Sequence, residues 1–203
     1  MILTAMRSER YFVTHLELSL EDARELQNTY NIQYGLALEG LVRHHKIDPM
    51  EYNRLVDDAL PLEKLIKPDP VARRLLMRID RSEVCLWLLT NAYRTHGQRV
   101  VRLLGLQDFF EGITFCDYAR QPLICKPDPR SYLRAMADAG ITDPSRCYFV
   151  DDSALNTSAA SQMGWHTAHI LGSDDPEPEE PAADFTIRSL AQLTVCFPSL
   201  FKE

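Results

Sequence analysis

Short apolar runs alternate with helical segments between Glu83 and Leu171, and this alternation constrains the fold more than any other feature of the chain. The strand-type runs are EVCLWLLT (83–90), GITFC (112–116), CYFV (147–150) and HTAHIL (166–171). Helical patterns follow the first run as far as Gly105 and fill 130–140 and 154–164. Strands that alternate with helices over about 90 residues predict an α/β fold with a doubly wound, Rossmann-like parallel sheet.

The first third of the chain has a different pattern. Residues 1–79 show only helical periodicity, with apolar residues three and four positions apart. Ser19, Asp48 and Asp69 are the predicted N-caps, and a proline directly follows each of the two aspartates. We therefore predict a helical module over 1–79, including a helix that leads into the core, and an α/β core over 80–203.

Two segments follow the last strand-type run. GSDDPEPEEPAADF (172–185) is acidic and rich in proline, so we predict a solvated loop. SLAQLTVCFPSLF (189–201) has an amphipathic pattern, so we predict a final helix.

Composition excludes several classes of function. The formal net charge is -7 and the pI is near 5.4, which argues against a general nucleic-acid binder because phosphate neutralisation needs clustered Lys and Arg. The chain contains no uncharged apolar stretch of the roughly 18 residues that a membrane span needs. Its five cysteines are scattered without CxxC spacing, which indicates a reducing compartment. We predict a cytoplasmic or nuclear protein, with no nucleic acid or membrane as partner; its oligomeric state is left open.

Polar residues follow the strand-type runs at the edge of the sheet where ligands collect in open α/β folds. Thr90 and Asn91 come after the first run, Lys126 after the second, and Asp151 and Asp152 after the third. A hydroxyl and a cation suit the oxygens of a phosphoryl group, and paired carboxylates suit Mg²⁺. We predict that Thr90 and Lys126 bind phosphate and that the two aspartates bind the metal.

Each of these residues also has an ordinary structural explanation. A threonine at a strand end is often a helix cap, a lysine before a proline is often a loop residue, and adjacent aspartates often lie on a solvated turn. The joint spacing favours a shared site, because the 36 residues from Thr90 to Lys126 and the 25 from Lys126 to Asp151 each allow one helix and one strand. Phosphorelay receivers combine similar residues, but in them the acidic pair comes first.

LWLLTNA, CKPDPRSY and CYFVDDSALN resemble motifs II, III and IV of the haloacid dehalogenase superfamily, in that family's order. The helical stretch from NTYNIQYGLALEGLV to LPLEKLIKPD resembles the small cap domain of fungal pyrimidine 5'-nucleotidases. The likeness extends from about His15 to Leu171.

The resemblance implies a Mg²⁺-dependent phosphomonoesterase (a hydrolase) that acts on a nucleotide or a similar small phosphorylated metabolite. Thr90 and Lys126 match the family's phosphate-binding positions, which makes them the candidate catalytic residues. Asp151 and Asp152 match the metal-site carboxylates. Asn91 and Asn156 match supporting polar positions at the substrate.

The family's first motif does not match any part of this sequence. It is a buried central strand that ends in DxDx(T/V), and its first aspartate is the nucleophile. LVDDALP (55–61) is no substitute, because no strand-type run precedes it. We therefore expect the residues present to bind phosphate without appreciable turnover, and a non-catalytic binding or regulatory protein on the same fold is the alternative.

Loss of that central strand leaves three possibilities open. The flanking strands close up, a neighbouring chain donates a strand, or the sequence is a shortened version of a longer gene product, which we favour. Substrate selectivity is expected to reside in the helical module. There, Tyr30, Tyr34 and Leu38 are predicted to pack within the module, and the adjacent His44 and His45 are predicted to be solvated.

Overall fold

The computed structural model describes residues 2–202, so Met1 and Glu203, at the outer limits of the two predicted regions, lie outside the described residues. The helices are α1 Ile2–Leu16, α2 Leu20–Tyr34, α3 Ala37–His44, α4 Pro49–Leu55, α5 Leu62–Leu65, α6 Pro70–Met77, α7 Arg94–Leu103, α8 Pro129–Asp138, α9 Ala154–Gln162 and α10 Leu193–Cys196. The strands are β1 Trp87–Thr90, β2 Gly112–Phe115, β3 Tyr148–Asp151, β4 His166–Ile170 and β5 Phe185–Ile187. Short 3-10 helices occupy 107–109 (η1), 144–146 (η2), 190–192 (η3) and 198–200 (η4).

Residues 2–77 form helices α1 to α6 joined by short connections, as their periodicity predicts, and all three predicted N-caps are confirmed. The Ser19 hydroxyl accepts a hydrogen bond from the Asp22 amide at 3.1 Å. Asp48 caps α4 and Asp69 caps α6 in the same way, each over 2.9 Å. These side chains satisfy amides that have no partner within the first turn of a helix.

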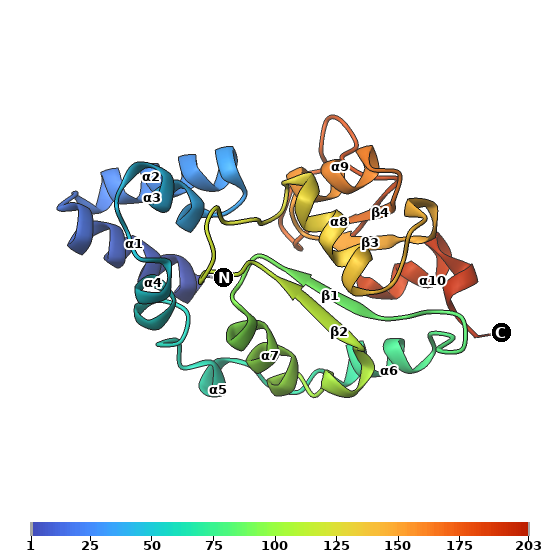
Figure 1. Cartoon of the computed structure of the whole chain (residues 1–203). Helices are drawn as coiled ribbons and strands as arrows, with labels where there is room; N and C mark the ends of the chain where they lie inside the picture. The colour runs from blue at the N-terminus through green and yellow to red at the C-terminus, as the bar shows by residue number, and fades with distance from the viewer. Residues whose placement is uncertain (1, 203) are drawn as a thin grey trace.

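The helical module packs around a hydrophobic core that it shares with the segment between β2 and α8. Phe12 of α1 and Leu38 and Leu41 of α3 are fully buried there. Tyr30, on α2, lies directly against Gly40, where an added Cβ would overlap its ring. Helices α2 and α3 therefore approach closely, and the predicted packing of Tyr30 and Leu38 is confirmed. Figure 1 shows α1 to α4 at the left of the molecule, whereas α6 lies below β1 and β2.

The predicted α/β fold with parallel strands is confirmed, and its sheet consists of two parts. β1 and β2 form a parallel pair, from Trp87 opposite Gly112 to Thr90 opposite Phe115. β3, β4 and β5 form a separate parallel sheet in that order. Within residues 2–202, β1 and β3 do not pair with each other, so the flanking strands have not closed up (Figure 1).

Helix α8 connects the two parts of the sheet through one hydrophobic cluster. Its Tyr132 is fully buried and makes edge-on contacts with Phe149 of β3 and with Trp165, just before β4. Leu89 of β1 packs against the same cluster. Side-chain packing, rather than a continuous hydrogen-bond ladder, therefore joins β1 to β3.

Three predictions about individual elements need correction. The first strand begins at Trp87 rather than at Glu83, because the Glu83 and Val84 amides bond back to Asp80 O in a turn. The short strand β5 follows the acidic loop and was not predicted. The single final helix is wrong: 189–201 contains η3, α10 and η4 in succession, and Pro198 cannot donate the backbone hydrogen bond that a continuous helix needs.

None of the helices in residues 2–202 combines the length and the apolar character that crossing a membrane requires. All five cysteines are free thiols, and Cys116 and Cys125 are buried.

Candidate active site

The predicted site residues lie at the carboxyl ends of the strands and in the loop before α8. Thr90 is the last residue of β1 and Asp151 the last of β3, and Asp152 follows directly. Lys126 lies three residues before the start of α8. The Thr90 hydroxyl accepts a hydrogen bond from the Ala92 amide at 3.1 Å, so it also stabilises the turn after the strand.

Lys126 and Asp151 meet in a buried ion pair. Lys126 Nζ donates to Asp151 Oδ2 at 2.5 Å, and the two side chains are only 8% and 9% exposed. The ammonium also lies 5.3 Å from the centre of the Phe149 ring. A buried charge is costly unless it is paired, so this geometry fixes the cation beside the end of β3.

The second oxygen of Asp151 is held by the start of α9. Oδ1 accepts from the Ser153 amide at 2.9 Å and from Asn156 Nδ2 at 2.8 Å. Asn156 is buried, and its backbone carbonyl accepts from the Tyr132 hydroxyl at 2.8 Å. Burial, and next the negative charge of Asp151, raises the pKa of Tyr132, which keeps this phenol protonated as a donor. The Asn156 side chain therefore orients the carboxylate.

Asn91 joins the strand end, the lysine loop and the helical module. Its Nδ2 donates to Lys126 O at 2.8 Å and to Gly35 O at 3.2 Å. Its Oδ1 accepts from the Lys126 amide at 2.7 Å. Gly35 ends α2 with φ +72°, and a Cβ there would collide with Lys126 O. The Asn91 side chain thus sets the backbone position of Lys126 in this structure.

Asp152 differs from Asp151 in its surroundings, because its side chain is exposed. Its backbone oxygen lies 3.3 Å from Nε2 of the buried His169 on β4. The two carboxylates offer the hard oxygen donors that Mg²⁺ takes one or two at a time, with water and phosphate oxygens completing the shell. Within residues 2–202, no group of three or more His, Cys, Asp or Glu side chains is arranged to hold a metal by itself.

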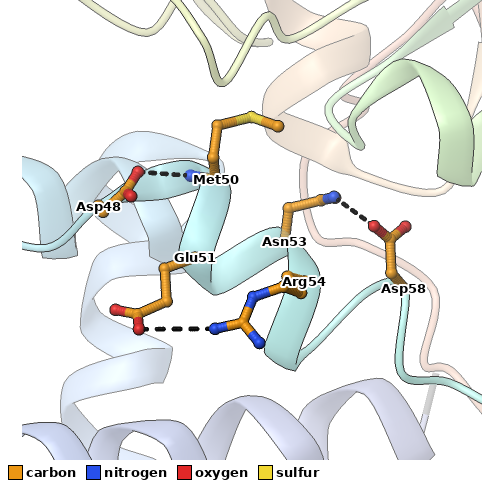
Figure 2. A pocket seen from close by; sticks show the side chains of 6 residues that line it. All are labelled: Asp48, Met50, Glu51, Asn53, Arg54 and Asp58. Atoms are coloured by element: carbon orange, nitrogen blue, oxygen red, sulfur yellow. Dashed lines mark hydrogen bonds and ion pairs between the residues drawn. The ribbon is translucent and has the colours of Figure 1, made fainter.

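Of two hollows within residues 2–202, the larger does not coincide with these residues. It measures about 580 Å³ and is formed around α4. Figure 2 shows that its polar groups already bond to each other: Asp48 with the Met50 amide, Asn53 with Asp58, and Glu51 with Arg54. One atom is an exception: Asn53 Oδ1 is buried without a hydrogen-bond partner within residues 2–202, but none of the predicted site residues lies in this hollow.

The smaller hollow, about 350 Å³, lies between the helical module and the lysine loop. We call it the cap cleft; its walls include Tyr34, Glu39 and Arg43 on one side and Cys125, Pro127 and Asp128 on the other. Sequence reasoning did not identify Glu39 and Arg43. The sequence signal that could have indicated them is their spacing of four positions, which places both on one face of a helix.

Comparison with known proteins agrees with this arrangement. Residues 3–164 match the family described as "Hydrolase: haloacid dehalogenase-like hydrolase". "Phosphate metabolism protein 8" of Saccharomyces cerevisiae is 36% identical over 170 residues, which are 79% of this chain and 53% of the yeast protein. The chain therefore spans about half the length of this curated relative.

Solved structures show the same fold at lower identity. CbbY from Rhodobacter sphaeroides, in complex with phosphate, has a TM-score of 0.68 at 20% identity and covers 95% of this chain and 89% of its own. The L-2-haloacid dehalogenase of Xanthobacter autotrophicus has a TM-score of 0.60 at 21% identity, and the match covers 98% of this chain and 93% of the dehalogenase chain. The chain belongs to the haloacid dehalogenase-like hydrolase family.

Proposed function

We propose that this chain carries the phosphate and metal site of a Mg²⁺-dependent phosphomonoesterase that acts on a nucleoside monophosphate or a similar small metabolite. The observation that carries the proposal is the buried Lys126–Asp151 pair, which holds the Lys126 ammonium beside the end of β3. Asn91, which follows Thr90 at the end of β1, bonds to the Lys126 backbone. The phosphate complex of the R. sphaeroides relative and the name of the yeast relative are consistent with a phosphorylated substrate.

In this proposal each residue has a defined task. Lys126 neutralises the phosphate, and Thr90 donates its hydroxyl to a phosphate oxygen. Asn91 positions the lysine backbone, and Asn156 orients Asp151. Asp151 and Asp152 would hold Mg²⁺, which as a Lewis acid supplies further charge neutralisation when bound.

We propose further that residues 1–203 alone turn over very little substrate. No segment of the sequence matches the motif that carries the family's nucleophilic aspartate, and Asp151 is assigned here to the metal rather than to attack on phosphorus. Loss of the nucleophile in a serine protease costs on the order of 10⁶ in rate, which indicates the scale of the deficit. A non-catalytic binding or regulatory role is the second candidate, and it predicts the same binding without turnover.

Titration calorimetry with inorganic phosphate, with and without Mg²⁺, tests the binding part. We expect saturable binding that Lys126→Met weakens by about tenfold or more, because a charge-assisted hydrogen bond contributes about 1.5–3 kcal/mol. Arg54→Met, at the exposed hollow of Figure 2, is the control and should leave the affinity unchanged. If the unaltered protein binds no phosphate, the proposed function is wrong.

An assay of phosphate release from a panel of nucleoside monophosphates tests the catalytic part. Incubation of the 203-residue chain with Mg²⁺ should release no phosphate above the background. Clear turnover that Asp151→Asn abolishes would refute the expected inactivity and support an enzyme complete in this chain.

A further inference from the structure

The cap cleft contains an acidic side chain whose hydrogen bonding is incomplete. Glu39 is buried, with its side chain only 5% exposed. Its Oε1 accepts from Arg43 Nε at 2.6 Å, whereas Oε2 is buried with no hydrogen-bond partner among residues 2–202. A buried carboxylate oxygen without a donor is costly, so a site of this kind is expected to receive an N–H or O–H group.

Arg43 provides the complementary group beside it. Its guanidinium lies 4.9 Å from the centre of the Tyr34 ring, and its side chain is half exposed. The Tyr34 hydroxyl is in turn 2.7 Å from His44 Nε2, which fixes the ring that supports the arginine. Of the guanidinium N–H groups, only Nε is engaged by another described residue, so the others can donate to a ligand.

The cleft lies close to the proposed phosphate position. Cys125 and Pro127, on its wall, flank Lys126 in the chain. Asn91 bonds both to the lysine backbone and to Gly35, at the end of the helix that carries Tyr34. In Figure 1 the segment that leads into α8 passes the end of α2. A ligand with its phosphate at Lys126 therefore has the cap cleft beside it.

We propose that Glu39 and Arg43 recognise a lactam edge, that is, a ring N–H next to a C=O, on the base of a nucleoside monophosphate. The N–H donates to Glu39 Oε2, and the C=O accepts from the Arg43 guanidinium. The volume of about 350 Å³ is within the range of small-ligand sites. This inference rests on the proposed function, for which it names the specificity-determining residues.

Titration calorimetry of the 203-residue chain with Mg²⁺ tests the inference. The probes are uridine monophosphate, its N3-methyl derivative, inosine monophosphate, ribose 5-phosphate and inorganic phosphate. Uridine monophosphate should bind about tenfold or more tightly than ribose 5-phosphate, as expected for a hydrogen bond to a charged group. N3-methylation removes the N–H and should abolish that gain. Inosine monophosphate, which has the same edge on a larger base, should also bind more tightly than ribose 5-phosphate.

Glu39→Gln is the diagnostic variant. It should reduce the preference for uridine monophosphate over ribose 5-phosphate to less than about threefold and leave the affinity for inorganic phosphate unchanged. Glu51→Gln is the matched control, because Glu51 is also paired with an arginine beside a hollow but is partly exposed. It should leave every affinity unchanged.

The outcomes separate this inference from the proposal on which it rests. If phosphate binds and depends on Lys126, but the unaltered protein does not prefer uridine monophosphate over its N3-methyl derivative, the lactam assignment is wrong while the phosphate site stands. If Glu39→Gln retains the preference, Glu39 is not the acceptor. If no phosphate compound binds, both proposals fail.

Discussion

At the scale of single residues, Asp57 is a buried carboxyl group whose ionisation affects stability. Its side chain lies in the helical module, and its exposed fraction is only 7%. Burial, and secondarily the charge of Asp58, raises its pKa to about 7. The folded state disfavours the ionised carboxylate. The contribution of Asp57 to the unfolding free energy is therefore fully present below its unfolded pKa near 4, and it is lost as the pH rises through about 7.

Asp57→Asn should therefore change the pH dependence of stability. Between about pH 4 and pH 8, the unfolding free energy of the variant should rise by about 2–4 kcal/mol relative to the unaltered protein, since the amide cannot ionise. Urea unfolding at a series of pH values measures this difference. Asp174→Asn, in the exposed acidic loop, should show no such trend. A difference that is independent of pH would contradict the raised pKa.

The residues that sequence reasoning singled out were predicted with unequal success. The meeting of Lys126 with Asp151 follows from their positions after strands, because parallel strands end at one edge of a sheet. The orphan oxygen of Glu39 could not be foreseen, because burial of one carboxylate depends on packing between the module and the lysine loop. The prediction of solvated histidines is confirmed for His44, which is exposed and bonds to Tyr34, whereas His45 is only partly exposed and bonds to Tyr30.

At the scale of elements, the contact between the end of α2 and the lysine loop depends on Gly35. Gly35→Ala would place a Cβ in collision with Lys126 O, in a conformation with φ +72° that disfavours any side chain. Gly140, which follows α8, has nearly the same φ of +71°, and a Cβ added there would meet nothing within 4 Å, so Gly140→Ala isolates the cost of backbone strain.

We expect Gly35→Ala to lose about 1–3 kcal/mol more unfolding free energy than Gly140→Ala, because the loop must move to accommodate the methyl group. Chemical denaturation measures this difference. Phosphate affinity should also fall only in the Gly35 variant, since Lys126 moves with its backbone. Equal losses in both variants would show that the loop tolerates the contact.

The elements themselves show which sequence signals are reliable. The N-caps and the apolar strand runs depend on neighbouring residues; the N-caps appear where predicted, and each predicted run contains a strand, although the first strand begins later than expected. β5 has only three residues and is defined by its pairing with β4, so local pattern carried little information about it. The split of 189–201 into short helices follows from Pro198, whose missing amide outweighs the amphipathic pattern of the run.

At the scale of the whole molecule, one tryptophan lies in or beside each part of the sheet. Trp87 begins β1 and donates to Thr114 Oγ1 at 3.0 Å, whereas Trp165 lies in the cluster between α8, α9 and β3. All four residues of β1 are only partly buried, whereas Thr167, Ala168 and His169 of β4 are buried. The β3–β4–β5 part is therefore the better packed.

Single-tryptophan variants can report on each part separately. The variant Trp165→Phe leaves Trp87 as the reporter of β1 and β2, and the variant Trp87→Phe leaves Trp165 as the reporter of the other part. The Trp87 signal should change at a lower urea concentration than the Trp165 signal, because less apolar surface is buried around β1. Far-ultraviolet circular dichroism of both variants is the control for any change in global stability. Coincident transitions would show that α8 couples the two parts into one cooperative unit.

The division between β1 and β3 also affects how the protein behaves in concentrated solution. Within the described residues each of these strands is hydrogen-bonded on one side only, and in Figure 1 β1 lies between β2 and β3. Backbone amides and carbonyls on an open strand edge readily accept an extended segment of another molecule. Intermolecular capture at this seam is thus the route by which we expect the chain to aggregate during storage, and short soluble peptides that occupy the seam would act as stabilising additives.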